Sequence, residues 1–178
     1  MIFWICLIAG LGFAWLGVKK GFYVWVATLF SAMAAIYIGV LSTPVILKMS
    51  PEYSQSGYYA AATMFAMAMA VFVILQLFGY FYLLRDAEEY FPKLIDQVGG
   101  ALCGFLFSYF LIGFILYLLA IMPFSQTDIP SFLPQRDSML KFSSPAIIRA
   151  CNFIGAYSLE CFDGEPEAVV EKLTTMEK

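Results

Sequence analysis

The sequence contains no histidine among its 178 residues. Histidine is the commonest general base and the commonest side-chain ligand of transition metals, so its absence removes the usual route to both kinds of site. Charged residues are also scarce, at 13% against roughly a quarter in soluble domains. The four cysteines form no CxxC pair. We therefore expect a protein that is not an enzyme and that holds no metal and no cofactor.

Hydrophobic residues make up 62% of the chain and aromatic residues 18%. A soluble protein of this composition would expose large apolar patches to water, which indicates that lipid is the solvent. The formal net charge of −3 does not favour nucleic acid as a partner. The expected partners are the lipid bilayer and either other membrane proteins or further copies of this chain.

Four long segments carry no charged residue, at about 2–18, 22–41, 58–84 and 98–122. Each is close to or longer than the roughly 20 residues that cross a bilayer as a helix. The first segment lacks a basic start and exceeds the apolar core of a signal peptide, so we interpret it as a short span. Residues 1–123 are thus predicted to form an all-α, integral membrane four-helix bundle. Only Lys19, Lys20 and Gly21 separate the first two segments, which predicts a tight antiparallel hairpin.

The composition changes after the fourth segment, and residues 124–178 are predicted to form a solvated tail. Ser144 and Pro145 are typical of a helix start, and apolar residues then recur every three or four positions up to Cys161. This pattern predicts a short extramembrane amphipathic helix at about 144–162, lying on the outer face of the membrane or on a partner. Cys151 and Cys161 are ten residues apart in this stretch, and a disulfide and two free thiols both remain open.

The short links predict the orientation of the bundle. Lys19, Lys20, Arg85 and Lys93 lie in the two links at one end, whereas Lys48 lies near the membrane at the other end. Basic residues concentrate in short cytoplasmic loops. We therefore expect both of these links in the cytoplasm and both termini outside it.

Small residues recur every four positions on two of the predicted spans. Gly100, Gly104 and Ser108 form one such stripe, and Ala62, Ala66 and Ala70 form the other. Small residues allow two helix backbones to approach closely inside a membrane. The stripes are predicted to serve packing within the bundle, with a dimer interface as the alternative.

Gln76 is the one large polar side chain within a predicted span. It is interpreted as a structural amide, bonded to a carbonyl or to a hydroxyl such as that of Thr28, Ser31 or Ser108; a place in a transport pathway is the alternative. A Ser108–Lys20 catalytic pair is the least favoured interpretation, since nothing in the sequence brings the two residues together. At the predicted inner interface, we hypothesise that Asp96 forms an ion pair with Lys19 or Lys20 and so ties the first hairpin to the second.

Two segments carry a resemblance to a known family. GVKKGFYVWVATLFSAMAAIYIGV (17–40) is similar to the opening of the CvpA (colicin V production) family, which has a small residue, two basic residues and Gly-Phe between its first two spans. LIDQVGGALCGFLFSYFLIGFILYLL (94–119) resembles the family's last span, with Asp96, Gly99, Gly100 and Gly104 at the matching positions. Gln97 stands where a basic residue is usual.

The resemblance implies a multi-pass protein of the bacterial inner membrane, linked to colicin V production and export, a toxin biosynthetic process, and to envelope function. The expected function is that of a non-catalytic accessory or scaffold protein. A channel or transporter subunit, or a small structural subunit of a larger membrane complex, is the alternative.

Overall fold

The computed structural model describes residues 2–49, 57–82, 92–122, 136–157 and 170. In these ranges the protein is all-α, as the sequence predicted, and five helices follow one another along the chain. They are α1 (Ile2–Lys20), α2 (Phe22–Met49), α3 (Gly57–Tyr82), α4 (Lys93–Ile121) and α5 (Arg136–Tyr157).

Three of the described helices are long and apolar enough to cross a membrane, namely α2, α3 from Gly57 to Phe81, and α4. The predicted first span forms α1, but α1 is not among these three, so the count of four spans stays a prediction. The second predicted span, 22–41, extends eight residues further to Met49.

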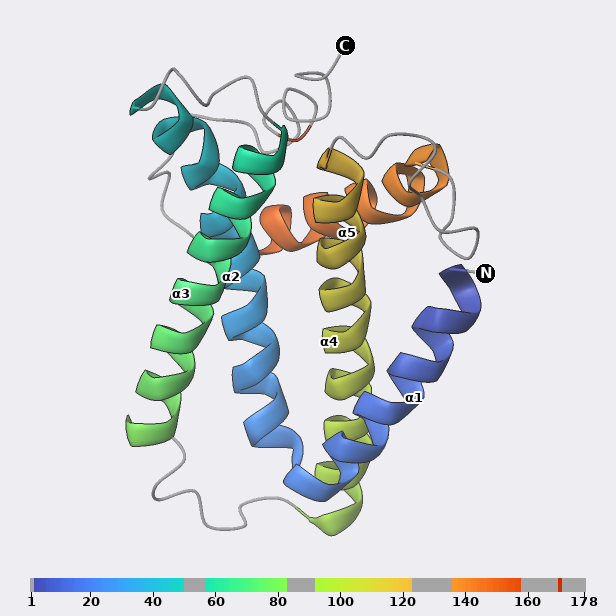
Figure 1. Ribbon diagram of the computed structural model, residues 1–178. Helices are drawn as coiled ribbons and strands as arrows, with labels where there is room; N and C mark the ends of the chain where they lie inside the picture. Colours follow the sequence, from blue (N-terminus) through green and yellow to red (C-terminus); the bar gives the residue numbers. More distant parts are fainter. Residues whose placement is uncertain (1, 50–56, 83–91, 123–135, 158–169, 171–178) are drawn as a thin grey trace.

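The helices lie side by side in the order α3, α2, α4, α1 (Figure 1), with α4 between α2 and α1. The sequence predicted a tight hairpin of the first two spans, and this prediction is wrong beyond the turn itself. Only Gly21 separates α1 from α2, but the two helices diverge from it, and α1 packs against α4 from Gly10 to Gly17.

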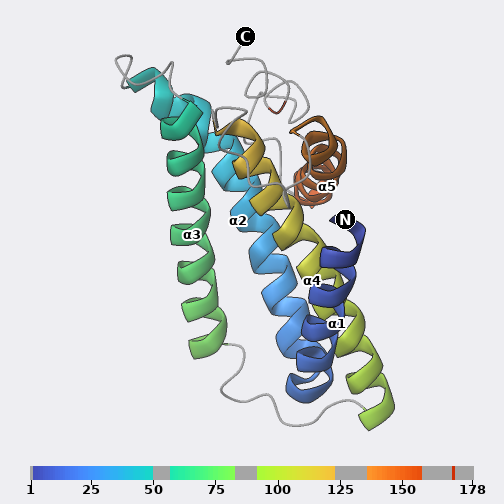
Figure 2. The ribbon, with the colours of Figure 1, turned by 45° about the vertical axis from the view of Figure 1, so that its right-hand side comes forward.

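Pro44, three residues beyond the predicted end of the second span, lies inside α2. Proline has no N–H to donate to the carbonyl four residues earlier, and its ring crowds that carbonyl, so helices bend where it occurs. The last turns of α2, beyond Pro44, lean away from the rest of the helix (Figure 2). The neighbouring Thr43 hydroxyl is buried and donates a hydrogen bond of 2.7 Å to the Gly39 carbonyl.

Helix α5 crosses α4 and α2 near the end of the bundle where α1 begins (Figures 1 and 2). It starts at Arg136, eight residues before the predicted start, and Pro145 lies within it. Its apolar face packs against the protein's own helices: Cys151 joins Val40, Met64 and Tyr117 in the main core, together with Val170 of the tail. The repeat of apolar residues therefore indicated an amphipathic helix correctly, but the surface it covers is the bundle.

Candidate functional site at the junction of α1, α2 and α4

The chain reverses direction at a single residue. Gly21 has a φ of +86°, in the left-handed region that side chains other than glycine rarely adopt. Its N–H donates a hydrogen bond of 3.1 Å to the Gly17 carbonyl and so closes the last turn of α1. Helix α2 begins at the next residue, Phe22. This reversal places the end of α1 and the start of α2 beside the first turns of α4.

Asp96, in the first turns of α4, caps the start of α2. Its Oδ1 accepts a hydrogen bond of 2.7 Å from the backbone N–H of Phe22. The first N–H groups of a helix have no partner within the helix, and their partial positive charge attracts a carboxylate. Because Asp96 is also near the start of α4, its charge is favourably placed with respect to two helix N-termini.

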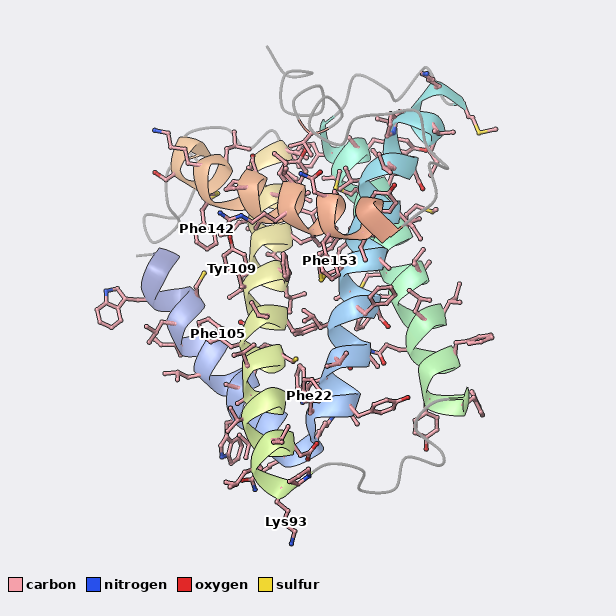
Figure 3. The ribbon with its side chains drawn as sticks, turned by 180° about the vertical axis from the view of Figure 1, so that it is seen from behind. Phe22, Lys93, Phe105, Tyr109, Phe142 and Phe153 are labelled. Carbon is pink, nitrogen blue, oxygen red and sulfur yellow. The ribbon has the colours of Figure 1, made fainter. Side chains whose placement is uncertain are left out.

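The approach of Asp96 depends on glycine at position 21. A Cβ built on Gly21 would lie 2.8 Å from Oδ2 and 3.0 Å from Oδ1 of the carboxylate. On the other side of the junction, the ring of Phe22 lies against Gly99 at the lower part of α4 (Figure 3). Glycine at position 21 therefore allows both the reversal of the chain and the close approach of the Asp96 carboxylate.

The sequence predicted the tie between the two links but named the wrong partner. Among the described residues, no ion pair joins Asp96 to Lys19 or Lys20, and Asp96 instead binds a backbone amide. The Lys19 ammonium lies 3.8 Å from the centroid of the Trp15 ring, a cation–π contact within α1. Lys19 and Lys20 are both exposed.

The glycine stripe of α4 lies against α1. A Cβ built on Gly100 would overlap the Gly17 carbonyl, and one built on Gly17 would overlap the Gly100 carbonyl. One turn further along α4, a Cβ on Gly104 would overlap the Phe13 carbonyl. Ser108, the third residue of the stripe, is fully buried. The two helices thus meet backbone to backbone, which only residues without side chains allow.

The alanine stripe of α3 has a different place. Ala62, Ala66 and Ala70 are exposed on the face of α3 that points away from the bundle. The contact with α2 comes instead from Ala60, Ala61, Met64 and Ala68, all of them buried. At the closest approach, a Cβ on Gly39 would lie 3.1 Å from the Ala68 Cβ and 3.2 Å from the Met64 carbonyl.

Sequence reasoning missed the role of Trp25, which stands in the apolar run after the turn. Its indole N–H donates a hydrogen bond of 3.3 Å to the Leu16 carbonyl near the end of α1. Its ring contacts Phe13 of α1 edge-on at 6.1 Å and Phe107 of α4 at 5.6 Å between centroids. Trp25 therefore links the same three helices one turn above Asp96. Trp25 lies within an unbroken run of apolar residues, and nothing in this run distinguishes it from its neighbours.

The polar candidates within the spans lie apart from this junction. Gln76 is half-buried on α3, and the hydroxyls of Thr28 and Ser31 donate to carbonyls of their own helix, those of Val24 and Ala27. Among the described residues, the Ser108 hydroxyl has no hydrogen-bond partner. Ser108 is twelve residues beyond Asp96, about 18 Å along α4, so the structure does not bring it to Lys20 at the turn.

The described residues contain no group of three cysteine or acidic side chains that would hold a metal ion. Cys151 is a free thiol with 0% exposure, and Cys161 lies outside the described residues. Burial disfavours the charged thiolate and raises the pKa of Cys151 to about 12. This thiol is therefore unsuited to nucleophilic or metal-binding chemistry at neutral pH.

Comparison with known families adds one finding. A family model described as "Colicin V production protein" matches residues 3–142, which include both segments that meet at the junction. The match confirms the resemblance inferred from the sequence. No curated protein and no solved structure matches the chain.

Proposed function

The chain belongs to the colicin V production protein family, and on this basis we propose that it is a non-catalytic accessory or scaffold protein of the bacterial inner membrane. It is a multi-pass membrane protein with three candidate spans, so the lipid bilayer is its surrounding medium. The proposed role is to hold other membrane proteins in place, in the production and export of colicin V and in envelope function.

One observation carries the proposal: the residues that mark the family resemblance bind one another. The Asp96 carboxylate accepts a hydrogen bond from the Phe22 amide, and Gly17 and Gly100 allow the backbones of α1 and α4 to approach closely. A catalytic or transporting carboxylate has to be free to meet a substrate, a proton or an ion. Here the Asp96 carboxylate is hydrogen-bonded to the start of another helix, which supports a role in stabilising the helix bundle.

Ser108 is fully buried, which further supports the scaffold function over the alternative function of a channel. A water file beside Gln76 and Ser108 would favour a pathway through the bundle, but a side chain with 0% exposure does not line an open one. The surface that remains for partners in the membrane includes the outward face of α3, where Phe65, Val73 and Leu77 are exposed.

The proposal is tested in a bacterium that makes colicin V and lacks its own family member. The wild-type chain is expected to restore extracellular toxin. Gly100→Leu, which separates α1 from α4, is expected to lose this effect even where its membrane level is matched to wild type. Gly79→Ala is the control, because no atom of the described residues lies within 4 Å of a Cβ at Gly79.

A second arm separates a scaffold from a channel. The purified chain is reconstituted into vesicles that contain a fluorescent dye sensitive to K⁺ or to protons. We expect no flux above that of empty vesicles. A flux that falls in Gln76→Leu would overturn the scaffold role, as would full restoration of toxin by Gly100→Leu at a wild-type membrane level.

A further inference from the structure

Helix α5 crosses the bundle at a defined level of α4. Phe142 of α5 meets Tyr109 of α4 with ring centroids 5.7 Å apart (Figure 3), and a Cβ built on Gly113 would lie 3.0 Å from the Cβ of Ala146. Gly113 is twenty residues beyond Lys93, so the crossing lies about 30 Å from the lysine end of α4.

The two faces of α5 differ in character. The face against the bundle is buried and mostly apolar; it includes Ala146, Ala150 and Ile154, with Ser143 as a buried polar residue. The exposed residues of the helix are mostly polar, and they are Ser138, Lys141, Pro145, Arg149, Asn152 and the apolar Phe153. From position 138 to position 155 the helix carries two cations and no acidic residue. This stretch is therefore positive in a chain whose net charge is −3.

The level of α5 matches a bilayer boundary. Lys19, Lys20 and Lys93 are exposed at the opposite end of the bundle. Helix α1 has 19 residues, about 28 Å, and runs from that end towards the level of α5 (Figure 1). Both lengths equal the roughly 30 Å thickness of a hydrocarbon core. A charged side chain is strongly disfavoured at the centre of a bilayer, so Lys141 and Arg149 belong at or beyond the boundary.

We propose that the exposed face of α5 lies in one headgroup layer and binds anionic phospholipids, with Lys141 and Arg149 as ligands of their phosphates. The ends of α2, α3 and α4 beyond α5 then stand outside the hydrocarbon. In that part Leu47, Ala60 and Ile121 belong to a buried core with Val170, while Val45 and Met49 are exposed. The proposal requires α2, α3 and α4 to span the bilayer, and it is independent of the scaffold role.

The lipid contact is tested on the full chain, reconstituted in phosphatidylcholine vesicles with and without phosphatidylglycerol and then extracted in mild detergent. Native mass spectrometry counts the retained lipids. The double variant K141Q/R149Q is expected to retain several-fold less phosphatidylglycerol than wild type, with an unchanged thermal midpoint because both side chains are exposed. Lys48→Gln is the control, since Lys48 lies at the end of α2, beyond α5.

Two results would overturn the proposal: equal phosphatidylglycerol retention by wild type and the double variant, or equal retention of phosphatidylcholine and phosphatidylglycerol by wild type. The level of α5 is measured separately, with nitroxides on Asn152→Cys and on Leu102→Cys, an exposed position of α4 about midway between Lys93 and Gly113. The Asn152 label is expected to meet a water-soluble relaxation agent and the Leu102 label to meet oxygen. A label at Asn152 as deep as that at Leu102 would contradict the proposed level.

Discussion

The backbone contact between α1 and α4 makes a quantitative prediction through a pair of glycine-to-alanine variants. A Cβ at Gly100 of α4 would overlap the carbonyl of Gly17 of α1, whereas no atom of the described residues lies within 4 Å of a Cβ at Gly12 of α1. Both changes raise helix propensity by the same amount, about 1 kcal/mol. The difference between the variants therefore reports the contact alone. Forcing a methyl group into a packed interface costs about 1–3 kcal/mol, and the upper part of this range applies where backbone obstructs it.

We therefore expect Gly12→Ala to be neutral or stabilising, and Gly100→Ala to be less stable than Gly12→Ala by about 2–3 kcal/mol. The free energy of unfolding is measured by titrating a denaturing detergent into micelles that contain the purified protein, with tryptophan fluorescence as the readout. Trp25 lies at the same junction, so its emission follows the separation of the helices. Equal unfolding free energies for the two variants would show that α1 and α4 do not approach this closely.

Three further predictions follow from the junction and from α5. Asp96→Ala is expected to lower the unfolding free energy by about 1 kcal/mol, the usual effect of losing a helix cap, and Asp96→Asn by less because it keeps an acceptor for Phe22. Gly21→Ala is expected to lower the unfolding free energy. Part of this loss is expected to vanish in an Asp96→Ala background, because the Asp96 carboxylate lies 2.8 Å from the added Cβ. Additive effects of the two changes in a double-mutant cycle would argue against this contact. In a variant whose only cysteine is Cys151, this thiol is expected to resist maleimide at pH 7, because a thiol with a pKa of about 12 is ionised in roughly 1 molecule in 10⁵. A cysteine introduced on the exposed face by Asn152→Cys should react quickly. Equal reaction rates at the two positions would show that α5 is not packed on the bundle.

The all-α class and three of the spans were predictable because uncharged runs of 20 or more residues have few other structures available in a bilayer. The helix ends were less predictable. The second span was predicted to end at about residue 41, before Pro44, yet the buried Thr43 and Leu47 on either side of this proline continue the packing of α2 and keep it helical. In α5, likewise, Met139 before the expected start is buried against Leu116 and Ala120, so tertiary packing extends the helix towards its N-terminus.

Part of the candidate site, the glycine stripe of α4, could be predicted from the sequence. Spacing alone identified Gly100 and Gly104, because a repeat of four residues defines a helix face whatever its partner is. The same rule failed to place Ala62, Ala66 and Ala70, which are exposed. Alanine is small enough to pack yet apolar enough to face lipid, so its spacing does not decide between the two. Glycine repeats are more informative, since glycine weakens a helix unless a close approach requires it.

The partner of Asp96 shows a similar limit. Nearby lysines suggested an ion pair because the sequence displays side-chain charges but not the N–H groups that a helix start leaves unpaired. The single-residue turn at Gly21 brings such an N–H to the level of Asp96, and the resulting hydrogen bond is short and charge-assisted. An ion pair between exposed groups would contribute only about 0–1 kcal/mol and would order two long side chains. The backbone amide is already fixed, and it is therefore the better partner.

These contacts also explain why the first two helices diverge. Asp96 holds the start of α4 against the start of α2, and Gly100, one turn later, holds it against the end of α1. A helix of about 10 Å diameter fixed at both contacts occupies the angle between its two neighbours. Trp25, Phe13 and Phe107 then fill the space immediately above, where α1 and α2 have begun to separate. A bulky residue at position 100 would therefore displace α4 from both neighbours at once, and this is why a single glycine is expected to determine the arrangement of three helices.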